Sequence, residues 1–180
     1  PIWQGILWGA LAQPVVFSLN NQMVGISNKL GITHLDAALY SPLPEETIKL
    51  LGVVIIVAAF KNVRHPYQAA AIGMAIGLGF DAMENVPFIL HAAIDNLDGD
   101  LWGVIITGIG RFFVGAFSHA LYTGVAAWGV GKLYADARHG YWQVAGFWLA
   151  GIALHTLFNG STMIAGEWPA TILVIALITW

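Results

Sequence analysis

Long apolar runs, separated by short polar stretches, dominate this sequence of 180 residues. Six runs stand out, at residues 2–19, 45–60, 67–92, 101–133, 141–164 and 168–180. Each is continuously apolar, whereas the strands of a membrane barrel alternate between lipid-facing and interior residues. A helix needs roughly 20 apolar residues to cross the hydrocarbon core of a bilayer. The pattern predicts an all-α protein, a polytopic transmembrane helical bundle of about six membrane segments that form one domain over residues 1–180.

The composition excludes several other classes of protein. Hydrophobic residues make up 58% of the chain and charged residues 9%, whereas about 25% of the residues in a soluble domain are charged. A chain this apolar is not disordered. Its seven Lys and Arg residues and net charge of -3 cannot form a phosphate-binding surface, so we expect a lipid bilayer and no nucleic acid as its partner. The absence of cysteine excludes disulfides and thiolate chemistry.

Two of the runs do not have the length of one simple span. Residues 101–133 are too many, so we expect a spanning helix to begin near Gly110 or Arg111, with residues 101–109 at the interface or dipping into the membrane. Residues 168–180 are too few, and the chain does not begin with Met, so we expect it to be trimmed at both ends. Two GxxxG pairs, which predict close helix packing, occur at residues 5–9 and 73–77.

Basic residues gather in two of the connections between the runs, with Lys61 and Arg64 in one and Lys132 and Arg138 in another. Because loops rich in Lys and Arg stay in the cytoplasm, we expect both connections on that side of the membrane. Residues 20–44 and the acidic connections would then lie on the outer side.

Ionisable groups inside apolar runs are costly unless they face protein or water, so they mark candidate functional sites. The first cluster is Glu45, Glu46 and Lys49, in which Lys49 lies one helical turn from both carboxylates. A helix end with a surface ion pair explains this cluster equally well. The second cluster is Glu84 with Asn85, deep in the third run. For Asn85, an interhelical hydrogen bond is the purely structural alternative.

Two more clusters follow along the chain. Arg111 and His119 share the fourth run, and His155 and Asn159 are four residues apart on one helix face in the fifth. The side chain of Arg111 could either extend to the lipid headgroups or pair with a carboxylate, and both explanations fit the sequence equally well. A lone His inside a membrane helix is more often a satisfied core residue than a catalyst or ligand.

The depth of these residues joins them into one predicted site. Counted from the expected outer ends of their helices, Glu84, His119 and His155 lie about eight residues deep, or roughly 12 Å. Glu45 and Glu46 approach from the same side. A carboxylate and an imidazole at one height can activate a water molecule for attack on a carbonyl. Alternatively, His119, His155 and Glu84 could hold a zinc ion with an open position for water, assembled from separate helices because no HExxH motif is present.

The four clusters, in this order, resemble a known family. The sequence reads EExxK at residues 45–49, FxxxEN at 80–85, a membrane His at 119 and HxxxN at 155–159. This is similar to the PrsW family of intramembrane proteases, which is related to the CAAX prenyl endopeptidases and to the scaffold subunit of gamma-secretase. The resemblance implies proteolysis of membrane-anchored protein substrates, such as site-1 cleavage of an anti-sigma factor, in the plasma membrane of a bacterium or archaeon.

The resemblance also implies roles for individual residues. Glu45 and Glu46 would be catalytic, with His119 and His155 as their partners in water activation or metal binding. Glu84 and Asn159 complete the catalytic set, and the supporting residues are Lys49, Asn85 and Arg111. The prenyl endopeptidases carry an Arg where Leu50 stands here, which makes prenylated proteins less suitable as substrates.

Two other functions fit the same residues. A non-catalytic scaffold subunit could keep the two histidines for structure, but the intact pair of Glu45 and Glu46 argues against it. A proton-coupled transporter could use the acids and histidines as a relay, but the sequence shows no internal repeat of the kind found in transporters. We therefore predict an intramembrane endopeptidase, of glutamic or metallo type, that cleaves near the outer side of the bilayer.

Overall fold

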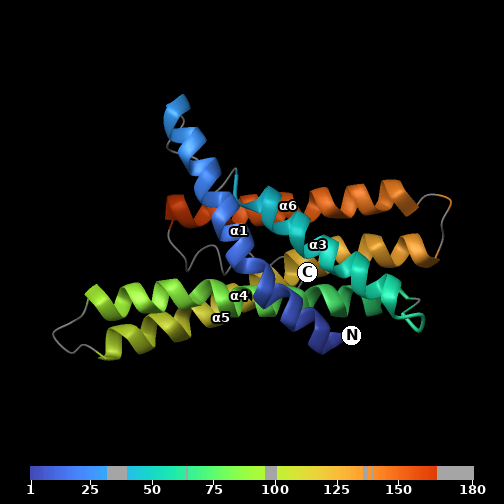
Figure 1. The fold of residues 1–180 in the computed structure, drawn as a ribbon, viewed down its shortest axis with the longest axis horizontal. Helices are drawn as coiled ribbons and strands as arrows, with labels where there is room; N and C mark the ends of the chain where they lie inside the picture. Colours follow the sequence, from blue (N-terminus) through green and yellow to red (C-terminus); the bar gives the residue numbers. More distant parts are fainter. Residues whose placement is uncertain (32–39, 64, 96–100, 136–137, 139, 166–180) are drawn as a thin grey trace.

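The computed structural model describes residues 1–31, 40–63, 65–95, 101–135, 138 and 140–165, and every regular element within them is a helix (Figure 1). The helices are α1 (Ile2–Leu30), α3 (Pro42–Ala59), α4 (Pro66–Asp95), α5 (Leu101–Ala135) and α6 (Gly140–Ala165). This confirms the predicted all-α fold. Two of these helices, α1 and α5, are long and apolar enough to cross a membrane. The sixth apolar run of the sequence lies outside the described residues.

Helix α3 is the centre of the bundle. It contacts α1, α4, α5 and α6. Helices α4 and α5 pack along each other, and α6 lies against α5 (Figure 1). Helix α1 crosses α4 and α3, and its C-terminal end extends beyond the other helices (Figure 1). Side chains on the buried face of α3 can therefore meet residues from each of the other four helices.

One face of α3 is buried along its whole length, and this face is polar at one end and apolar at the other. Its buried residues recur every three or four positions, as one core-facing stripe of a helix requires: Pro42, Glu45, Glu46, Lys49, Gly52, Val53, Ile56 and Val57. The C-terminal part of the stripe packs with Ile72 and Ile76 of α4 and with Ala127 and Val130 of α5. The N-terminal part brings two carboxylates and an ammonium group into the interior.

Glycines allow α4 to lie very close to its two neighbours. A Cβ atom at Gly9 of α1 would overlap the backbone oxygen of Ile76 in α4. A Cβ atom at Gly77 of α4 would overlap the backbone oxygen of His119 in α5. The close packing predicted from the GxxxG pairs is therefore confirmed for both helix contacts. The second contact also fixes the height of His119 relative to α4.

Two helices are longer than the sequence predicted. Helix α5 is continuous from Leu101, so the expected start near Gly110 or Arg111 is wrong. No proline interrupts residues 101–111, and glycine alone weakens a helix without ending it. Helix α1 continues past the first apolar run and ends at Leu30, where Gly31, with a φ of 72°, caps the helix in the left-handed conformation.

The two basic connections lie at the same end of the bundle (Figure 1). The connection between α3 and α4 contains Lys61, and the connection between α5 and α6 contains Arg138. This placement is consistent with both connections being on one side of a membrane. That this side is the cytoplasm stays a prediction from the positive-inside rule.

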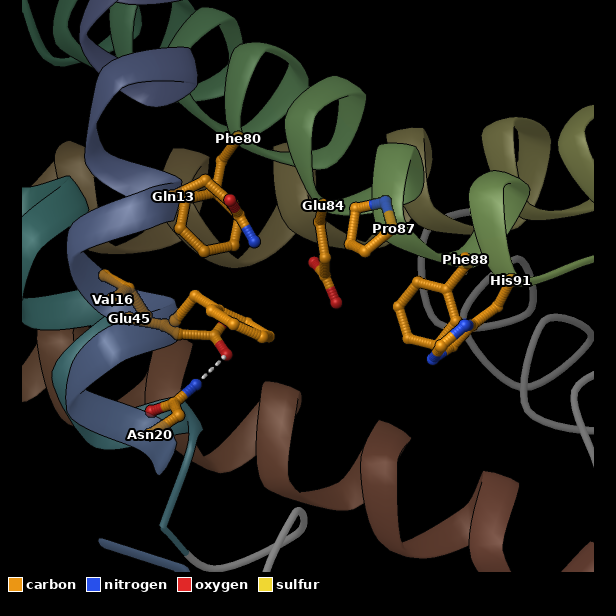
Figure 2. A pocket seen from close by; sticks show the side chains of 10 residues that line it. Gln13, Val16, Asn20, Glu45, Phe80, Glu84, Pro87, Phe88 and His91 are labelled. Carbon is orange, nitrogen blue, oxygen red and sulfur yellow. Dashed lines mark hydrogen bonds between the residues drawn. The ribbon is translucent and has the colours of Figure 1, made fainter. Parts of the chain in front are cut away.

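A cleft of about 250 Å³ lies between α1 and α4 (Figure 2). Its apolar lining includes Val16 and Phe17 of α1 and Phe80 and Phe88 of α4, and two carboxylates, Glu45 and Glu84, also line it. We call it the α1–α4 cleft. It connects the polar end of the buried α3 stripe with the outside of the bundle.

Candidate active site

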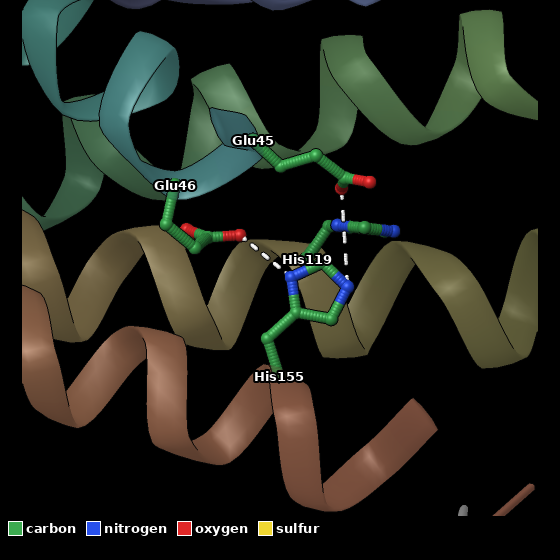
Figure 3. A group of neighbouring side chains, drawn as sticks. All are labelled: Glu45, Glu46, His119 and His155. Carbon is green, nitrogen blue, oxygen red and sulfur yellow. Dashed lines mark hydrogen bonds and ion pairs between the residues drawn. The ribbon is translucent and has the colours of Figure 1, made fainter. Parts of the chain in front are cut away.

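Side chains from three helices converge at the polar end of the α3 stripe (Figure 3). Helix α3 contributes Glu45 and Glu46, which lie side by side on its buried face, α5 contributes His119 and α6 contributes His155. All four residues are buried. The sequence motifs that were predicted to form one site are therefore brought together in space, although they are separated by up to 110 positions along the chain.

Glu46 is fully enclosed, and three side chains bind its carboxylate. Lys49 Nζ lies 2.9 Å from Oε1, and His155 Nδ1 lies 3.1 Å from the same oxygen. The hydroxyl of Thr123 in α5 donates to Oε2 at 3.2 Å. Glu46 therefore ties α3 to both α5 and α6, and its oxygens are already engaged within the protein.

Lys49 supplies the positive charge at the centre of the site. Besides Glu46, its Nζ lies 3.5 Å from Glu45 Oε2 and donates to His119 Nδ1 at 2.9 Å. The ammonium also lies 3.9 Å from the centre of the Phe80 ring. Its side chain is completely buried, and a buried cation is tolerated only when it is paired and hydrogen-bonded. The alternative reading of this cluster as a surface ion pair is therefore wrong.

His119 links Lys49 to a third carboxylate. Because an ammonium group can only donate, Nδ1 of His119 accepts from Lys49, and the ring proton of a neutral His119 then resides on Nε2. This Nε2 lies 2.9 Å from Glu84 Oε2, which comes from α4. The result is a continuous polar chain from Glu46 through Lys49 and His119 to Glu84.

His155 lies between the two carboxylates of α3 (Figure 3). Its Nδ1 contacts Glu46 at 3.1 Å, and its Nε2 lies 3.8 Å from Glu45 Oε2. The Tyr122 ring stacks on the imidazole with centroids 4.9 Å apart. The His119 ring meets it edge-on at 5.0 Å. The orientation of His155 is therefore set by its contact with Glu46 and by two ring contacts.

The comparisons with known proteins agree with this arrangement. A family model described as PrsW family intramembrane metalloprotease matches residues 2–180. The chain belongs to the PrsW family. No curated protein and no solved structure gave a match. Membership in the PrsW family confirms the resemblance inferred from the four motifs and makes the chain, at the level of its family, a membrane-embedded protease.

The description of PrsW proteins as metalloproteases implies a metal ion, and four side chains of the site carry suitable ligand atoms. One ligand atom from each of Glu45, Glu46, His119 and His155 can be chosen so that all four lie within 4.8 Å of one another. Imidazole nitrogens and carboxylate oxygens are the ligands that zinc prefers, and around a tetrahedral zinc they lie roughly 3.4 Å apart. Three of these four residues would therefore fit a catalytic zinc site with one open position, once the Lys49 ammonium has moved away from Glu46 and His119.

The carboxylates of this group differ from those that the sequence predicted for a metal. The predicted set was His119, His155 and Glu84, whereas the structure groups the two histidines with Glu45 and Glu46. Glu84 instead faces Nε2 of His119, on the opposite side of the ring from Lys49. Glu84 Oε2 lies 2.9 Å from this nitrogen but makes no hydrogen bond within the part of the chain that the structure describes.

The remaining predicted residues lie around the site. Asn159 Nδ2 donates to Ser41 Oγ at 3.3 Å, which joins α6 to the residue preceding α3. Arg111 Nε donates to Asn85 Oδ1 at 3.1 Å, and Asn85 Nδ2 donates to Asp81 Oδ2 at 3.1 Å. The interhelical hydrogen bond considered for Asn85 is thus present, with α5 as the second helix.

Two residues to which sequence analysis gave no role contact the carboxylates. Asn20 of α1 donates from Nδ2 to Glu45 Oε1 at 3.1 Å, and Thr123 donates to Glu46. Thr123 lies one helical turn after His119, a spacing that places both on one face. No local pattern points from Asn20 to Glu45, because they lie on different helices.

Proposed function

We propose that this chain hydrolyses peptide bonds in membrane-anchored protein substrates, near the outer side of the bilayer, as in site-1 cleavage of an anti-sigma factor. The observation that carries the proposal is the convergence of Glu45, Glu46, His119 and His155 in a buried site. A site of this kind is shielded from lipid and can hold water inside the membrane, where a peptide bond would otherwise not be accessible to water.

The two adjacent glutamates have different surroundings, which supports different roles for them. Glu45 lines the α1–α4 cleft and can therefore meet a substrate. Glu46 is enclosed by Lys49, His155 and Thr123. In the proposed mechanism, Glu45 removes a proton from water while the oxygen of that water attacks the scissile carbonyl carbon. Glu46 acts as a positioning residue for His155.

His155 and Glu45 are placed to act on the same water molecule. The 3.8 Å between His155 Nε2 and Glu45 Oε2 is too long for a direct hydrogen bond but suits two groups that share one water. After the attack, the proton taken up by Glu45 passes to the leaving amine as the C–N bond breaks. The Lys49 ammonium, which is bound by Glu46 and His119 and lies 3.5 Å from Glu45, stabilises the developing negative charge through its positive charge and not through a direct hydrogen bond.

In a metal-dependent form of this mechanism, Glu46, His119 and His155 would hold zinc, which leaves Glu45 free to act as the base. When bound, zinc would act as a Lewis acid that polarises the scissile carbonyl and promotes ionisation of the attacking water. Lys49 Nζ contacts Glu46 and His119, so these two residues can bind a metal ion only when the ammonium moves away from them. The proton transfers assigned to Glu45 are unchanged.

The test is cleavage of a panel of single-pass membrane proteins by the purified chain in detergent. Glu45→Gln and His155→Ala should each lower kcat at least 100-fold, because each removes a group that acts on the water. His65→Ala is the matched control, since His65 is exposed and lies in the connection between α3 and α4. Zinc content is measured on the same samples and should fall with His155→Ala if the enzyme is metal-dependent.

Two outcomes would contradict the proposal. If the wild type cleaves nothing across a broad panel, hydrolysis is not its activity. If the folded Glu45→Gln and His155→Ala variants cleave as fast as His65→Ala, catalysis occurs elsewhere. In either case a scaffold or transport function becomes the one to test.

A further inference from the structure

The α1–α4 cleft contains a polar side chain that the proposed mechanism does not use. Gln13 of α1 lines the cleft and is only 8% exposed. Its amide group points from α1 toward α4 (Figure 2). Within the part of the chain that the structure describes, this amide has no hydrogen-bond partner. Because Gln13 lines the cleft, its amide is available to exchange hydrogen bonds with a ligand there.

The chemistry of this amide indicates the kind of ligand. A carboxamide carries both donors and an acceptor, and it therefore complements a peptide unit, which presents one N–H and one C=O. In a membrane, an unwound stretch of backbone must find such partners in the protein, because lipid offers none. A peptide bond must leave the substrate's helix before water can reach its carbonyl, so an unwound stretch is the form in which a substrate meets Glu45.

The opposite wall of the cleft contains a proline. Pro87 lies inside α4 and lines the cleft. Proline has no N–H, so the carbonyl of Met83, one turn earlier on the same side of α4, receives no hydrogen bond from it. This acceptor lies next to Glu84 in the sequence. Pro87 thus interrupts the backbone hydrogen bonding of α4 where this helix lines the cleft.

We propose that the α1–α4 cleft binds the unwound segment of the substrate that adjoins the scissile bond. This proposal rests on the proposed function. Gln13 pairs with one peptide unit of this segment. Phe17 of α1 and Phe88 of α4, which are both partly exposed at the cleft, receive an apolar side chain of the substrate. The cleft selects substrates with a large apolar residue next to the cleaved bond and disfavours an acidic residue, because Glu45 and Glu84 are carboxylates.

The test uses synthetic single-pass peptides with a leucine-alanine span, which differ at one position beside the cleavage site as Ala, Leu, Phe or Asp. Gln13→Met, which keeps the volume but removes the amide, should raise KM about tenfold and change kcat less than about threefold, as expected for the loss of two hydrogen bonds in substrate binding. Gln4→Met is the matched control, because Gln4 is an exposed residue on the same helix. Phe17→Ala should reduce the preference for Leu and Phe over Ala about tenfold, whereas Phe117→Ala, on the exposed face of α5, should leave it unchanged.

A binding measurement separates failure of this proposal from failure of the proposed function. A photoreactive benzophenone side chain is placed at position 17 or 117 in the Glu45→Gln background, and crosslinking to the Leu peptide is compared. Stronger crosslinking at position 17 supports the cleft as the binding site even if the wild type cleaves no peptide. Equal crosslinking at both positions, or unchanged KM and preference in Gln13→Met and Phe17→Ala while the wild type still cleaves, overturns the proposal.

Discussion

Replacing Lys49 with Met should destabilise the protein far more than removal of a lysine normally does. The Lys49 ammonium is fully buried and lies 2.9 Å from Glu46 Oε1 and 3.5 Å from Glu45 Oε2. At an effective dielectric constant of about 20, these distances correspond to attractions of roughly 6 and 5 kcal/mol. Burying the charges offsets part of this gain, and breaking a buried ion pair on one side typically costs about 3–5 kcal/mol. We expect a loss of that size for Lys49→Met.

The assay is unfolding by sodium dodecyl sulfate in mixed micelles, followed by tryptophan fluorescence. Lys61→Met serves as the control, because Lys61 is exposed in the connection between α3 and α4, and it should change the free energy of unfolding by less than about 0.5 kcal/mol. Zinc should restore stability to Lys49→Met more effectively than it stabilises the wild type, since no ammonium then competes for Glu46 and His119. A ligand present at about 100 times its Kd adds roughly 2.7 kcal/mol.

The reasoning about Lys49 is refuted if Lys49→Met unfolds with the same free energy as Lys61→Met. That result would mean that the carboxylates of Glu45 and Glu46 do not depend on the ammonium for charge compensation. If zinc stabilises the wild type and Lys49→Met equally, the ammonium and the metal do not share a position.

Two further predictions concern the surroundings of the histidines. Gly77→Ala should push α5 away from α4 at His119, where a Cβ atom has no room, and should lower both the free energy of unfolding and the rate of cleavage. Gly146→Ala is the control and should change neither, because its Cβ atom meets no atom within 4 Å. Equal effects of the two substitutions would contradict the close-packing argument. Tyr122→Ala should lower the free energy of unfolding by about 3–5 kcal/mol, as for other buried aromatic residues, and should slow cleavage because His155 loses its stacking partner. Tyr122→Phe keeps the stacked ring and should retain most of the stability and most of the cleavage activity. Thermal unfolding and peptide cleavage measure these effects, and a Phe variant as damaged as the Ala variant would show that ring stacking is not what holds His155.

Local sequence patterns were sufficient for the helical nature of the chain and for most of the candidate residues. Continuous apolar runs indicate membrane helices because the bilayer leaves the backbone no other partners than its own. Charged residues inside those runs stand out for the same reason, and this is how Glu46, His119 and His155 were found. The lengths of α1 and α5 were not predicted, because hydropathy records where a chain is apolar, whereas a helix continues until its backbone is capped.

The contacts between helices could not be read from the sequence. Gln13 and Asn20 are polar residues in or beside an apolar run, but their importance depends on α1 crossing α3 and α4. The predicted zinc ligands included Glu84 in place of Glu45 and Glu46. That prediction was based on depth in the membrane, which does not specify which side of a histidine ring each carboxylate faces.

The sequence by itself determined that this chain is a bundle of apolar helices with a few costly polar groups, and the order of its four motifs identified its family. Only the tertiary structure decided which of those groups touch. Helical periodicity puts Glu45, Glu46 and Lys49 on one stripe, but their partners are chosen by how closely other helices approach that stripe. The approach of α4 to α5 depends on Gly77, which leaves room for the backbone at His119. The division of roles between an enclosed Glu46 and a Glu45 that lines the α1–α4 cleft follows from packing, which acts between residues far apart in the chain.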